Sequence, residues 1–579
     1  MIALRCFRRF RCGGLLAVVA VLACVRLPGA EATDNARPGA QPNVIIILAD
    51  DLGFSDLGCY GGEIHTPNLD GLAAGGLRFT GFHNTARCCP SRASLLTGLY
   101  PHQAGVGRMT FRDGKLPGYQ GQLRADTPTI AEVLKLAGYQ TAMSGKWHIS
   151  RTVVGPDHLT YLSNQRILKT FADLMSYPVK RGFDRYFGIL WGVANYFDPF
   201  SLVEGTNAVA SVPNGFYLTD AIAEHAIQDL QEFKRSGSPF FLFVAFTAPH
   251  WPLHARPEEL AEYRDTYKVG WDAIREKRYQ RQVAMGLFDP DDAALTPRAD
   301  RERPWSSVPD KDWTAALMTA HAAMVDRLDQ GVGRILQTLR ANGQMDNTLL
   351  FFLSDNGASP EEPREGGFDR PTRTRDGRPI RYRGEMEANG IRAGPETTFG
   401  SIGPMWANAA NTPFRYWKSQ TYEGGICTPL IVHWPAGIPA RGEFRRQPGH
   451  IIDLMATILD VSHAPFPGVF GGHPTAPPEG RSLAPAFANQ PIQRGALFWE
   501  HEGNLAVQVG DWKAVNSIAG GGKWELYHLK NDRTEMRDLS VRDPLRLSDL
   551  ISTWEAWAKR TNVLPAPPLP RERANAQPD

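Results

Sequence analysis

Polar residues that could bind a metal ion follow three apolar runs of the sequence. Asp50 and Asp51 follow the first run, His250 follows the second, and Asp355 with Asn356 follows the third. In an open α/β sheet, ligands bind at the carboxyl ends of the strands, so these residues are expected to meet. Carboxylate and amide oxygens favour a hard divalent cation, Ca²⁺ or Mg²⁺. A single acidic pair is more often a turn or a helix cap, but two such sites predict a metal centre.

A second group of reactive residues lies in the eleven residues from Cys88 to Gly98, CCPSRASLLTG. The chain has seven cysteines, and three of them precede residue 33. The other four are too few for a disulfide framework, and their spacing lacks the second close pair of a zinc site. The adjacent Cys88 and Cys89 therefore need a different explanation.

This segment resembles the signature of the type I sulfatases, arylsulfatase-like enzymes of the alkaline phosphatase superfamily. That signature is Cys-x-Pro-x-Arg followed by Leu-Thr-Gly, and Cys88, Pro90 and Arg92 match its first part. In the family, a separate formylglycine-generating enzyme oxidises the cysteine to formylglycine (3-oxoalanine), which acts as a hydrated gem-diol. The resemblance implies that Cys88 is the modified residue and that Cys89 fills the variable position.

Further segments resemble the same family and keep its order along the chain. They are Gly145-Lys146-Trp147-His148, Pro249-His250-Trp251-Pro252, Leu353-Ser354-Asp355-Asn356-Gly357, Lys418 with Tyr422-Glu423-Gly424-Gly425, and Trp524-Glu525-Leu526-Tyr527. Together the matches span about residues 43–560. The resemblance therefore covers nearly the whole chain.

The resemblance implies a role for each matched side chain. The expected metal ligands are Asp50, Asp51, Asp355, Asn356 and the formylglycine made from Cys88. Lys146, His250 and Lys418 are expected to bind the sulfate group, with His250 as the general acid for the leaving oxygen. Arg92, one helical turn after Cys88, would hold the gem-diol and the metal carboxylates in place.

His148 completes the implied catalytic cycle. One hydroxyl of the gem-diol would attack sulfur to give a sulfoenzyme intermediate, and His148 would help the second hydroxyl to expel sulfate. The implied reaction converts a sulfate monoester of an aryl alcohol or a carbohydrate into the alcohol and sulfate. Two alternatives stay open: a phosphate or phosphonate ester hydrolase on the same scaffold, and a non-catalytic protein that binds sulfated glycans.

The elements that must position these residues alternate between strands and helices. Apolar runs predict strands at 43–48, 240–246, 348–353 and 430–434, and helical patterns fall at 130–136, 221–233 and 313–339. This alternation predicts an α/β fold with a mostly parallel central sheet sandwiched by helices, and the resemblance implies an alkaline phosphatase-like version of it. Short alternating segments at 496–529 and a helical pattern at 545–558 predict a small C-terminal α+β subdomain with an antiparallel sheet.

The two ends of the chain differ in composition from the rest. Residues 1–32 are predicted to be a signal peptide, because four arginines precede an apolar run at 14–25 that is too short for a comfortable membrane span. An uncleaved anchor is the alternative, and Cys24 offers a site for lipid attachment. Residues 33–485 would form the catalytic domain, residues 486–562 the C-terminal subdomain, and residues 563–579 a disordered Pro-rich tail.

Charge and composition narrow the possible partners. The 63 basic and 61 acidic residues nearly cancel, and no basic block occurs beyond the N-terminus. No nucleic acid partner is therefore expected. Hydrophobic residues are 42% of the chain, which excludes wholesale disorder. The mature protein is expected to be periplasmic or secreted, or lipid-anchored, without an integral membrane span.

One arginine-rich insertion lies between the third strand-like run and Lys418. Residues 361–411 contain Arg364, Arg370, Arg373, Arg375, Arg378, Arg381, Arg383 and Arg392. They could form a basic rim that recognises further anionic groups on a glycan. A solvated surface loop explains the same composition equally well.

Overall fold

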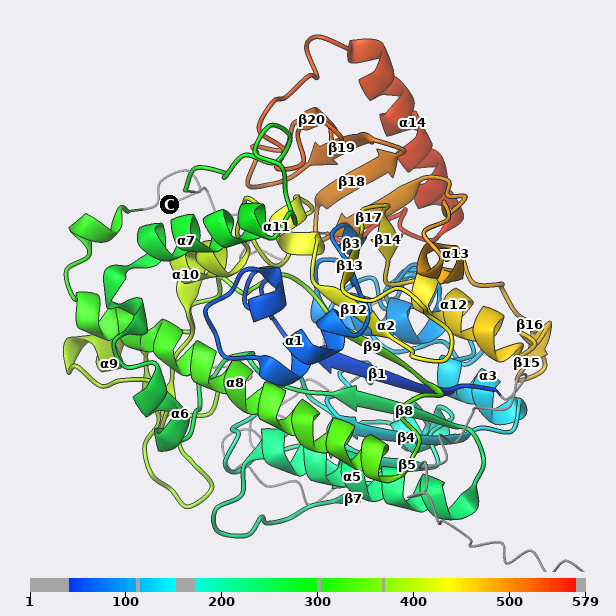
Figure 1. Cartoon of the computed structure of the whole chain (residues 1–579), viewed down its shortest axis with the longest axis horizontal. Helices are drawn as coiled ribbons and strands as arrows, with labels where there is room; N and C mark the ends of the chain where they lie inside the picture. Colours follow the sequence, from blue (N-terminus) through cyan, green and yellow to red (C-terminus); the bar gives the residue numbers. More distant parts are fainter. Residues whose placement is uncertain (1–40, 111–114, 152–171, 299–302, 367–369, 569–579) are drawn as a thin grey trace, which may run out of the picture.

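The computed structural model describes residues 41–110, 115–151, 172–298, 303–366 and 370–568 (Figure 1). The predicted signal peptide, residues 1–32, lies outside them. The main sheet has ten strands in the order β13 (Glu443–Arg445), β2 (Leu77–Phe79), β12 (Leu430–His433), β9 (Thr348–Ser354), β1 (Asn43–Ala49), β8 (Phe240–Ala245), β4 (Gln140–Gly145), β5 (Arg185–Ile189), β6 (Leu202–Glu204) and β7 (Asn207–Ala208). The expected α/β architecture is confirmed.

The centre of the sheet is parallel and fully enclosed. Strands β9, β1, β8, β4 and β5 all run in one direction. Every residue of β8 and β9 is buried. Their apolar runs have no polar alternation because helices cover both faces of the sheet.

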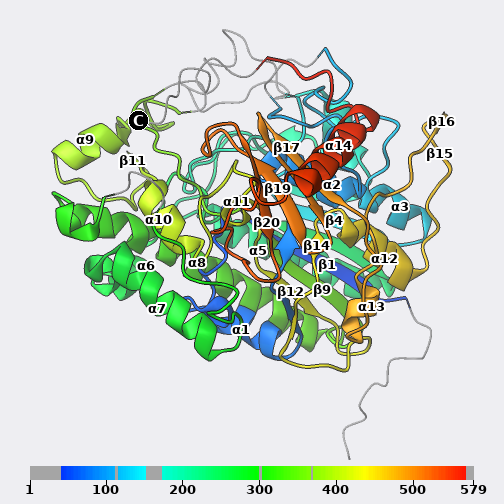
Figure 2. The same cartoon turned by 90° about the horizontal axis from the view of Figure 1, so that it is seen from above.

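Helices on the two faces hold the site segments against the sheet. Helices α1 (Pro67–Ala74), α5 (Leu218–Ser236) and α8 (Lys311–Ala341) pack on one face, and α2 (Cys88–Thr97) and α3 (Ile130–Leu136) lie on the other (Figures 1 and 2). Helix α3 has the predicted bounds and begins with a capping box between Thr129 and Glu132. Helices α5 and α8 extend a few residues beyond the predicted ranges, and Asp310 caps α8 by accepting from the Trp313 N–H.

Strand β12 is an exception within the mostly parallel sheet. It pairs antiparallel with both β9 and β2. Because of this direction, β12 begins at the edge where β1, β8 and β9 end, and the loop before it reaches that edge. In this loop, the Lys418 N–H donates to the Ala358 carbonyl (3.1 Å), which joins it to the segment after β9.

Shorter elements fill the connections of the main unit. Further helices are α6 (Pro257–Glu262), α7 (Trp271–Ala284), α9 (Arg383–Ala388), α10 (Gly403–Ala410), α11 (Glu423–Ile426), α12 (Asp453–Ser462) and α13 (Ala484–Phe487). Two-stranded sheets pair β10 (Arg381–Tyr382) with β11 (Thr398–Phe399), β14 (Gly449–His450) with β3 (Phe82–His83), and β15 (Val469–Phe470) with β16 (His473–Pro474). Within the described residues, no helix is long and apolar enough to cross a membrane.

The C-terminal subdomain has the predicted antiparallel sheet. Its order is β17 (Leu497–His501), β18 (Asn504–Val509), β19 (Trp512–Asn516) and β20 (Trp524–His528), and α14 (Pro544–Arg560) packs on it. Alternate side chains point to opposite faces, as strand geometry requires. Val507 packs in a core with Trp554 and Trp557 of α14, and Ala506 packs in a core with Tyr422 and Ile426 of the main unit. The sheet therefore connects α14 to the segment that follows Lys418.

The predicted tail begins with residues that the structure holds in place. Tyr119 Oη donates to the Val563 carbonyl (2.8 Å), and Arg108 donates to the carbonyls of Pro567 and Pro568 (2.8 Å each). Proline lacks an N–H but keeps its acceptor, so a Pro-rich segment can bind to donors of a folded unit. Residues 569–579 lie outside the described residues, and the domain limits 485/486 and 562/563 stay predictions.

Candidate active site

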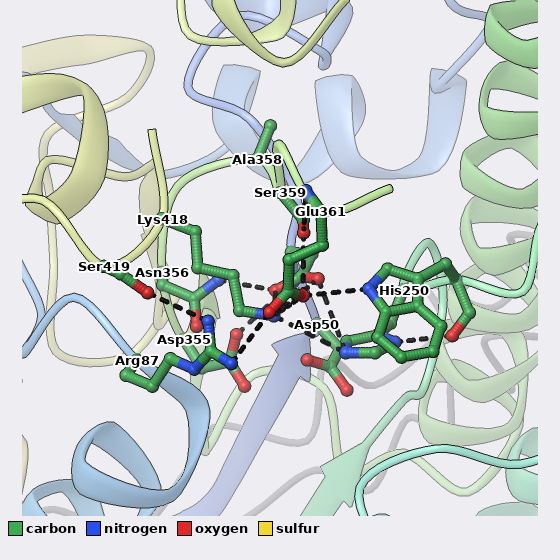
Figure 3. Close-up of polar contacts among 12 residues, drawn as sticks. Asp50, Arg87, His250, Asp355, Asn356, Ala358, Ser359, Glu361, Lys418 and Ser419 are labelled. Carbon is green, nitrogen blue, oxygen red and sulfur yellow. Dashed lines mark hydrogen bonds and ion pairs between the residues drawn. The ribbon is translucent and has the colours of Figure 1, made fainter. Parts of the chain in front are cut away.

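Four oxygen-bearing side chains meet where β1 and β9 end (Figure 3). The two strands are parallel neighbours, so Asp50 and Asp51 leave one strand beside Asp355 and Asn356 of the other. The Asp51 N–H donates to Asp355 Oδ1 (3.3 Å), and Asn356 Nδ2 donates to Asp51 Oδ1 (2.6 Å). All four side chains are buried. The structure thus brings together the four unmodified residues that were expected to bind metal.

This carboxylate cluster has the properties of a cation site. Asp50 Oδ1 and Asn356 Oδ1 are buried acceptors that receive no hydrogen bond from the described residues. Burial and the charge of Asp50 raise the pKa of Asp355 well above its usual value, although Arg92 opposes this rise. A divalent ion would satisfy both acceptors and offset the crowded negative charge. The donor set therefore fits Ca²⁺ or Mg²⁺.

Two buried cations fix the base of the site. Arg92 donates from Nε and Nη2 to Asp355 Oδ2 (3.0 and 2.8 Å). Its Nη1 donates to the carbonyl of Lys146 (2.7 Å), which ties α2 to the end of β4. The Lys146 ammonium forms an ion pair with Asp50. Because both cations have buried partners, little reorganisation is needed when an anion binds beside them.

Cys88 begins α2 and lies close to His148. Its sulfur, the Cys89 sulfur and a ring nitrogen of His148 lie within 4.8 Å of one another, and all three residues are buried. The hydrogen bond with the Cys89 thiol, together with His148 and Lys146, holds the pKa of Cys88 well below that of an ordinary thiol. Burial lowers the pKa of His148 to about 4, so the ring is neutral near pH 7. A thiol with a lowered pKa therefore lies next to a neutral imidazole.

His250 and Lys418 approach the cluster from two other elements (Figure 3). His250 Nδ1 lies 2.6 Å from the Trp251 carbonyl oxygen, and because a carbonyl only accepts, this nitrogen carries a proton. In the neutral ring Nε2 is then an acceptor, and it lies 3.5 Å from Lys418 Nζ and 3.5 Å from Asp51 Oδ2. Lys418 Nζ also lies 2.9 Å from Asp51. All the residues expected at the site are therefore brought together.

A cavity of about 300 Å³ opens above these groups. Four of the expected site residues line it: Cys88, His148, His250 and Lys418. Met109, Trp191, Val193 and Trp251 add apolar walls. A cavity of this size and lining suits a sulfate group with a small or partly enclosed alcohol portion.

Sequence reasoning missed three charged residues of this cavity, Arg87, Glu361 and Glu362, of which Figure 3 labels the first two. Arg87 Nη2 lies 2.8 Å from Glu361 Oε1, and Glu361 Oε2 lies 3.1 Å from Lys418 Nζ. Arg87 directly precedes Cys88, and Glu361 follows Asp355 by six positions. Proximity to a motif was the available signal, but the loop path that brings these residues together is not visible in the sequence.

Most arginines of the insertion have partners of their own. The ion pairs are Arg364–Glu362, Arg375–Asp198, Arg378–Asp376, Arg381–Glu385 and Arg383–Glu362. Arg373 donates to the Gly377 carbonyl (3.0 Å), and Arg370 lines the cavity. This pairing favours a structural role for the insertion over a free basic rim.

Known proteins share both the sequence and the fold of this chain. The sequence model described as Sulfatase matches residues 42–464. The chain belongs to the sulfatase family. This sulfatase is 34% identical over 564 residues to an uncharacterized sulfatase of Schizosaccharomyces pombe, with 91% of this chain and 95% of that protein covered. It is 31% identical over 461 residues to the arylsulfatase of Klebsiella aerogenes, with 77% and 91% covered.

A solved structure extends the likeness to the whole architecture. Ps i-CgsB in complex with k-i-k-neocarrahexaose is 25% identical to the sulfatase, with a TM-score of 0.62, and the match covers 93% of this chain and 98% of that one. The expected central sheet with helices and the C-terminal antiparallel subdomain are thus features of the sulfatase fold. The protein is an enzyme of the sulfatase class, which hydrolyses sulfate esters.

Proposed function

We propose that this sulfatase cleaves organic sulfate monoesters, of aryl or sugar alcohols, with a formylglycine made from Cys88 as the nucleophile. The observation that carries the proposal is the position of Cys88. Its side chain borders the cavity beside His148, His250 and Lys418, while Arg92 links its helix to the metal-type carboxylates. As an aldehyde hydrate, formylglycine would supply a hydroxyl nucleophile that can be regenerated after each turnover.

The same proposal includes a divalent cation. Ca²⁺, or Mg²⁺, would be held by Asp50, Asp51, Asp355, Asn356 and the modified Cys88. When bound, the ion supplies Lewis-acid stabilisation of charge on the ester oxygens. Arg92 keeps Asp355 oriented through two hydrogen bonds, and Lys146 keeps Asp50 oriented through its ion pair. These contacts hold the ligand oxygens in one arrangement before substrate arrives.

We assign the two lysines of the site to the stabilisation of negative charge and the two histidines to proton transfer. Lys146 and Lys418 bind the sulfate oxygens and stabilise negative charge that develops in the transition state. His250, when protonated at Nε2, donates that proton to the leaving oxygen. His148 lies beside residue 88 and acts there as the base, a role that its neutral ring permits.

Mass spectrometry combined with an assay tests this proposal. The protein is produced with and without a formylglycine-generating enzyme, its maturation partner, and the peptide that contains residue 88 is analysed. Conversion of Cys88 to formylglycine lowers the peptide mass by about 18 Da, as expected from thiol-to-aldehyde chemistry. Hydrolysis of 4-nitrophenyl sulfate should rise in proportion to the converted fraction. Full activity of a protein that keeps an unmodified thiol would refute the mechanism.

The two alternatives predict different results in the same assay. A phosphate or phosphonate ester hydrolase would turn over 4-nitrophenyl phosphate or phenylphosphonate esters faster than the sulfate. A protein that only binds sulfated glycans would retain a sulfated oligosaccharide without releasing sulfate. Cys88 with Pro90 and Arg92 favours a formylglycine sulfatase over a phosphatase that uses Ser or Thr as nucleophile. The complete set of carboxylates and site lysines favours catalysis over binding alone.

We also propose that the protein is exported after removal of residues 1–32. The basic and apolar character of this leader supports the proposal. N-terminal peptide analysis of the protein from its native host tests it. A start near residue 33 supports a periplasmic or secreted enzyme, a lipid-modified Cys24 supports an anchored form, and an intact leader contradicts export by cleavage.

A further inference from the structure

Glu361 places a carboxylate in the cavity between two cations of the site (Figure 3). Oε1 lies 2.8 Å from Arg87 Nη2, and Oε2 lies 3.1 Å from Lys418 Nζ. Trp251 Nε1 (2.9 Å) and Ser359 Oγ (3.0 Å) donate to Oε2. The side chain nevertheless keeps 28% of its surface exposed. Four partners fix this carboxylate, and it still borders the space that a substrate would enter.

The carboxyl group of Glu361 is ionised in this position. Burial would raise its pKa, but Arg87 and Lys418 hold the pKa well below its usual value. The negative charge offsets part of the positive potential that Arg87 and Lys418 present to a bound anion. Because Coulomb energy scales with the charge of the ligand, this offset weakens the binding of a dianion about twice as much as that of a monoanion.

The charge of the ester group differs between the two substrate classes that the site could accept. A sulfate monoester carries one negative charge, whereas a phosphate monoester of the same alcohol carries two at pH 8. The metal-type carboxylates and the lysines would suit either group, because both present tetrahedral anionic oxygens. A fixed negative charge at the rim of the anion site can discriminate between the two esters, because it repels the dianionic phosphate ester more strongly than the monoanionic sulfate ester.

We infer that Glu361 is a positioning and specificity-determining residue, which orients Arg87 and Lys418 and makes the site favour monoanionic sulfate esters over dianionic phosphate esters. The inference rests on the proposed function, since it concerns the same site. It gives the insertion a residue that influences the bound ester through Arg87 and Lys418, in contrast to the internally paired arginines of the same segment.

The test compares two esters with the same leaving group. For wild type and Glu361→Gln, kcat/KM is measured with 4-nitrophenyl sulfate and 4-nitrophenyl phosphate at pH 8 and constant salt. The amide keeps the size of the side chain and removes its charge. The sulfate-to-phosphate ratio should fall at least tenfold in the variant, because the phosphate ester gains more than the sulfate ester.

Two further variants separate charge from position. Glu361→Asp keeps the charge but shortens the reach to Arg87 and Lys418, so kcat/KM should fall for both esters while the ratio stays within threefold. Glu385→Gln is the matched control in the same insertion. The Glu385 carboxylate pairs with Arg381 and is not part of the cavity lining, so this change should alter the ratio less than threefold.

A binding measurement provides a readout that does not need turnover. Trp251 contacts Glu361, and its fluorescence should respond to ligands of the cavity. Benzenesulfonate, a monoanion, and phenylphosphonate, a dianion at pH 8, are titrated into each protein. In Glu361→Gln, the Kd of phenylphosphonate should fall at least tenfold relative to that of benzenesulfonate.

The possible failures are distinguishable. An unchanged ratio in Glu361→Gln, or an equal shift in Glu385→Gln, would overturn the inference and leave the sulfatase proposal intact. Wild-type enzyme that prefers the phosphate ester would instead overturn the proposed function. In that case the titration decides the inference by itself, because an unchanged relative Kd in Glu361→Gln overturns it.

Discussion

The protein contains two buried clusters of charged side chains, and one residue of each cluster lies only five positions from one of the other, Lys418 and Glu423. Lys418 belongs to the active-site cluster, and Glu423 belongs to a cluster at the junction with the C-terminal subdomain. At this junction, Lys513 Nζ lies 2.8 Å from Glu423 Oε1 and 2.7 Å from Glu535 Oε1. Arg533 also pairs with Glu423. Both clusters combine carboxylates with lysine and arginine in a buried environment.

The two clusters differ in what they leave available. At the active site, Asp50 Oδ1 and Asn356 Oδ1 lack a donor among the described residues, and a cavity opens beside them. At the junction, Lys513 and Arg533 of the C-terminal segment pair with the carboxylates of Glu423 and Glu535. The ion pair between Lys513 and Glu423 joins β19 to α11. Similar residues therefore prepare one region for a ligand and hold the other together. Changes to the first should affect turnover, and changes to the second should affect stability.

The largest loss of turnover is expected for Cys88→Ala. Removal of the nucleophile can lower kcat by about 10⁶-fold in a hydrolase that forms a covalent intermediate. Measurement of kcat/KM with 4-nitrophenyl sulfate and of the thermal unfolding midpoint checks this, and the midpoint should change little. Cys427→Ala is the control, since Cys427 is also buried but lies at the junction. Cys88→Ala protein that keeps more than a few per cent of wild-type activity would contradict the assignment.

Removal of divalent cations should have the next largest effect. Treatment with a chelator is expected to abolish turnover, and Ca²⁺ or Mg²⁺ should restore it. Since the ion binds only the folded state, Ca²⁺ at a hundred times its Kd should add about 2.7 kcal/mol to the free energy of unfolding. Thermal denaturation with and without Ca²⁺ measures this. Asp355→Asn should show a smaller increase, and an equal increase would place the ion elsewhere.

A smaller loss of turnover is expected for Lys146→Ala. One preorganised contact to transition-state charge typically contributes about 10²- to 10³-fold in kcat. The control is Lys135→Ala, because Lys135 is an exposed lysine that pairs with Asp184 on the surface. Steady-state kinetics of both variants should show a change below twofold for the control. A similar loss in both would mean that the position of Lys146 has no special importance.

The smallest effect on turnover, with a large effect on stability, is expected for Lys513→Met. Breaking a buried ion pair leaves uncompensated carboxylates and costs about 3–5 kcal/mol of folding free energy. Chemical denaturation measures this loss, and kcat/KM per folded molecule should stay within threefold. Arg546→Ala removes an exposed partner of Asp543 and should cost less than about 1 kcal/mol. If Lys513→Met lost turnover but not stability, the contrast between the two clusters would fail.

Local patterns were sufficient to predict the parts of the site that follow strands. The runs before Asp50 and Asp355 are buried parallel strands, so their polar termini had to meet at one edge. The sequence analysis placed Arg92 one helical turn after Cys88, and both residues lie in α2. The placement of these residues follows from local sequence patterns and from the way strands connect in an α/β sheet.

The remaining features depend on contacts between distant segments. The run at 430–433 has the composition of the parallel strands, and only its pairing with β9 and β2 gives it the opposite direction. Glu361 is one acidic residue in a long insertion, and its role depends on Arg87, Trp251 and Lys418 coming close in space. The order of residues 563–568 likewise depends on donors near residue 110. No local pattern contains this information.

The hydrogen bond between the Lys418 N–H and the Ala358 carbonyl has a consequence for how the enzyme could change. It fixes the two ends of the intervening segment against each other, so this segment forms a closed loop on the sheet edge. For a flexible loop, each doubling of length adds only about 0.6 kcal/mol of closure entropy. The exposed part of the segment around α9 could therefore be exchanged for one of another length or shape, while the largely buried residues 398–417 and the metal ligands stay in place. Changes in this part of the chain should therefore alter the substrate range with the smallest loss of folding free energy.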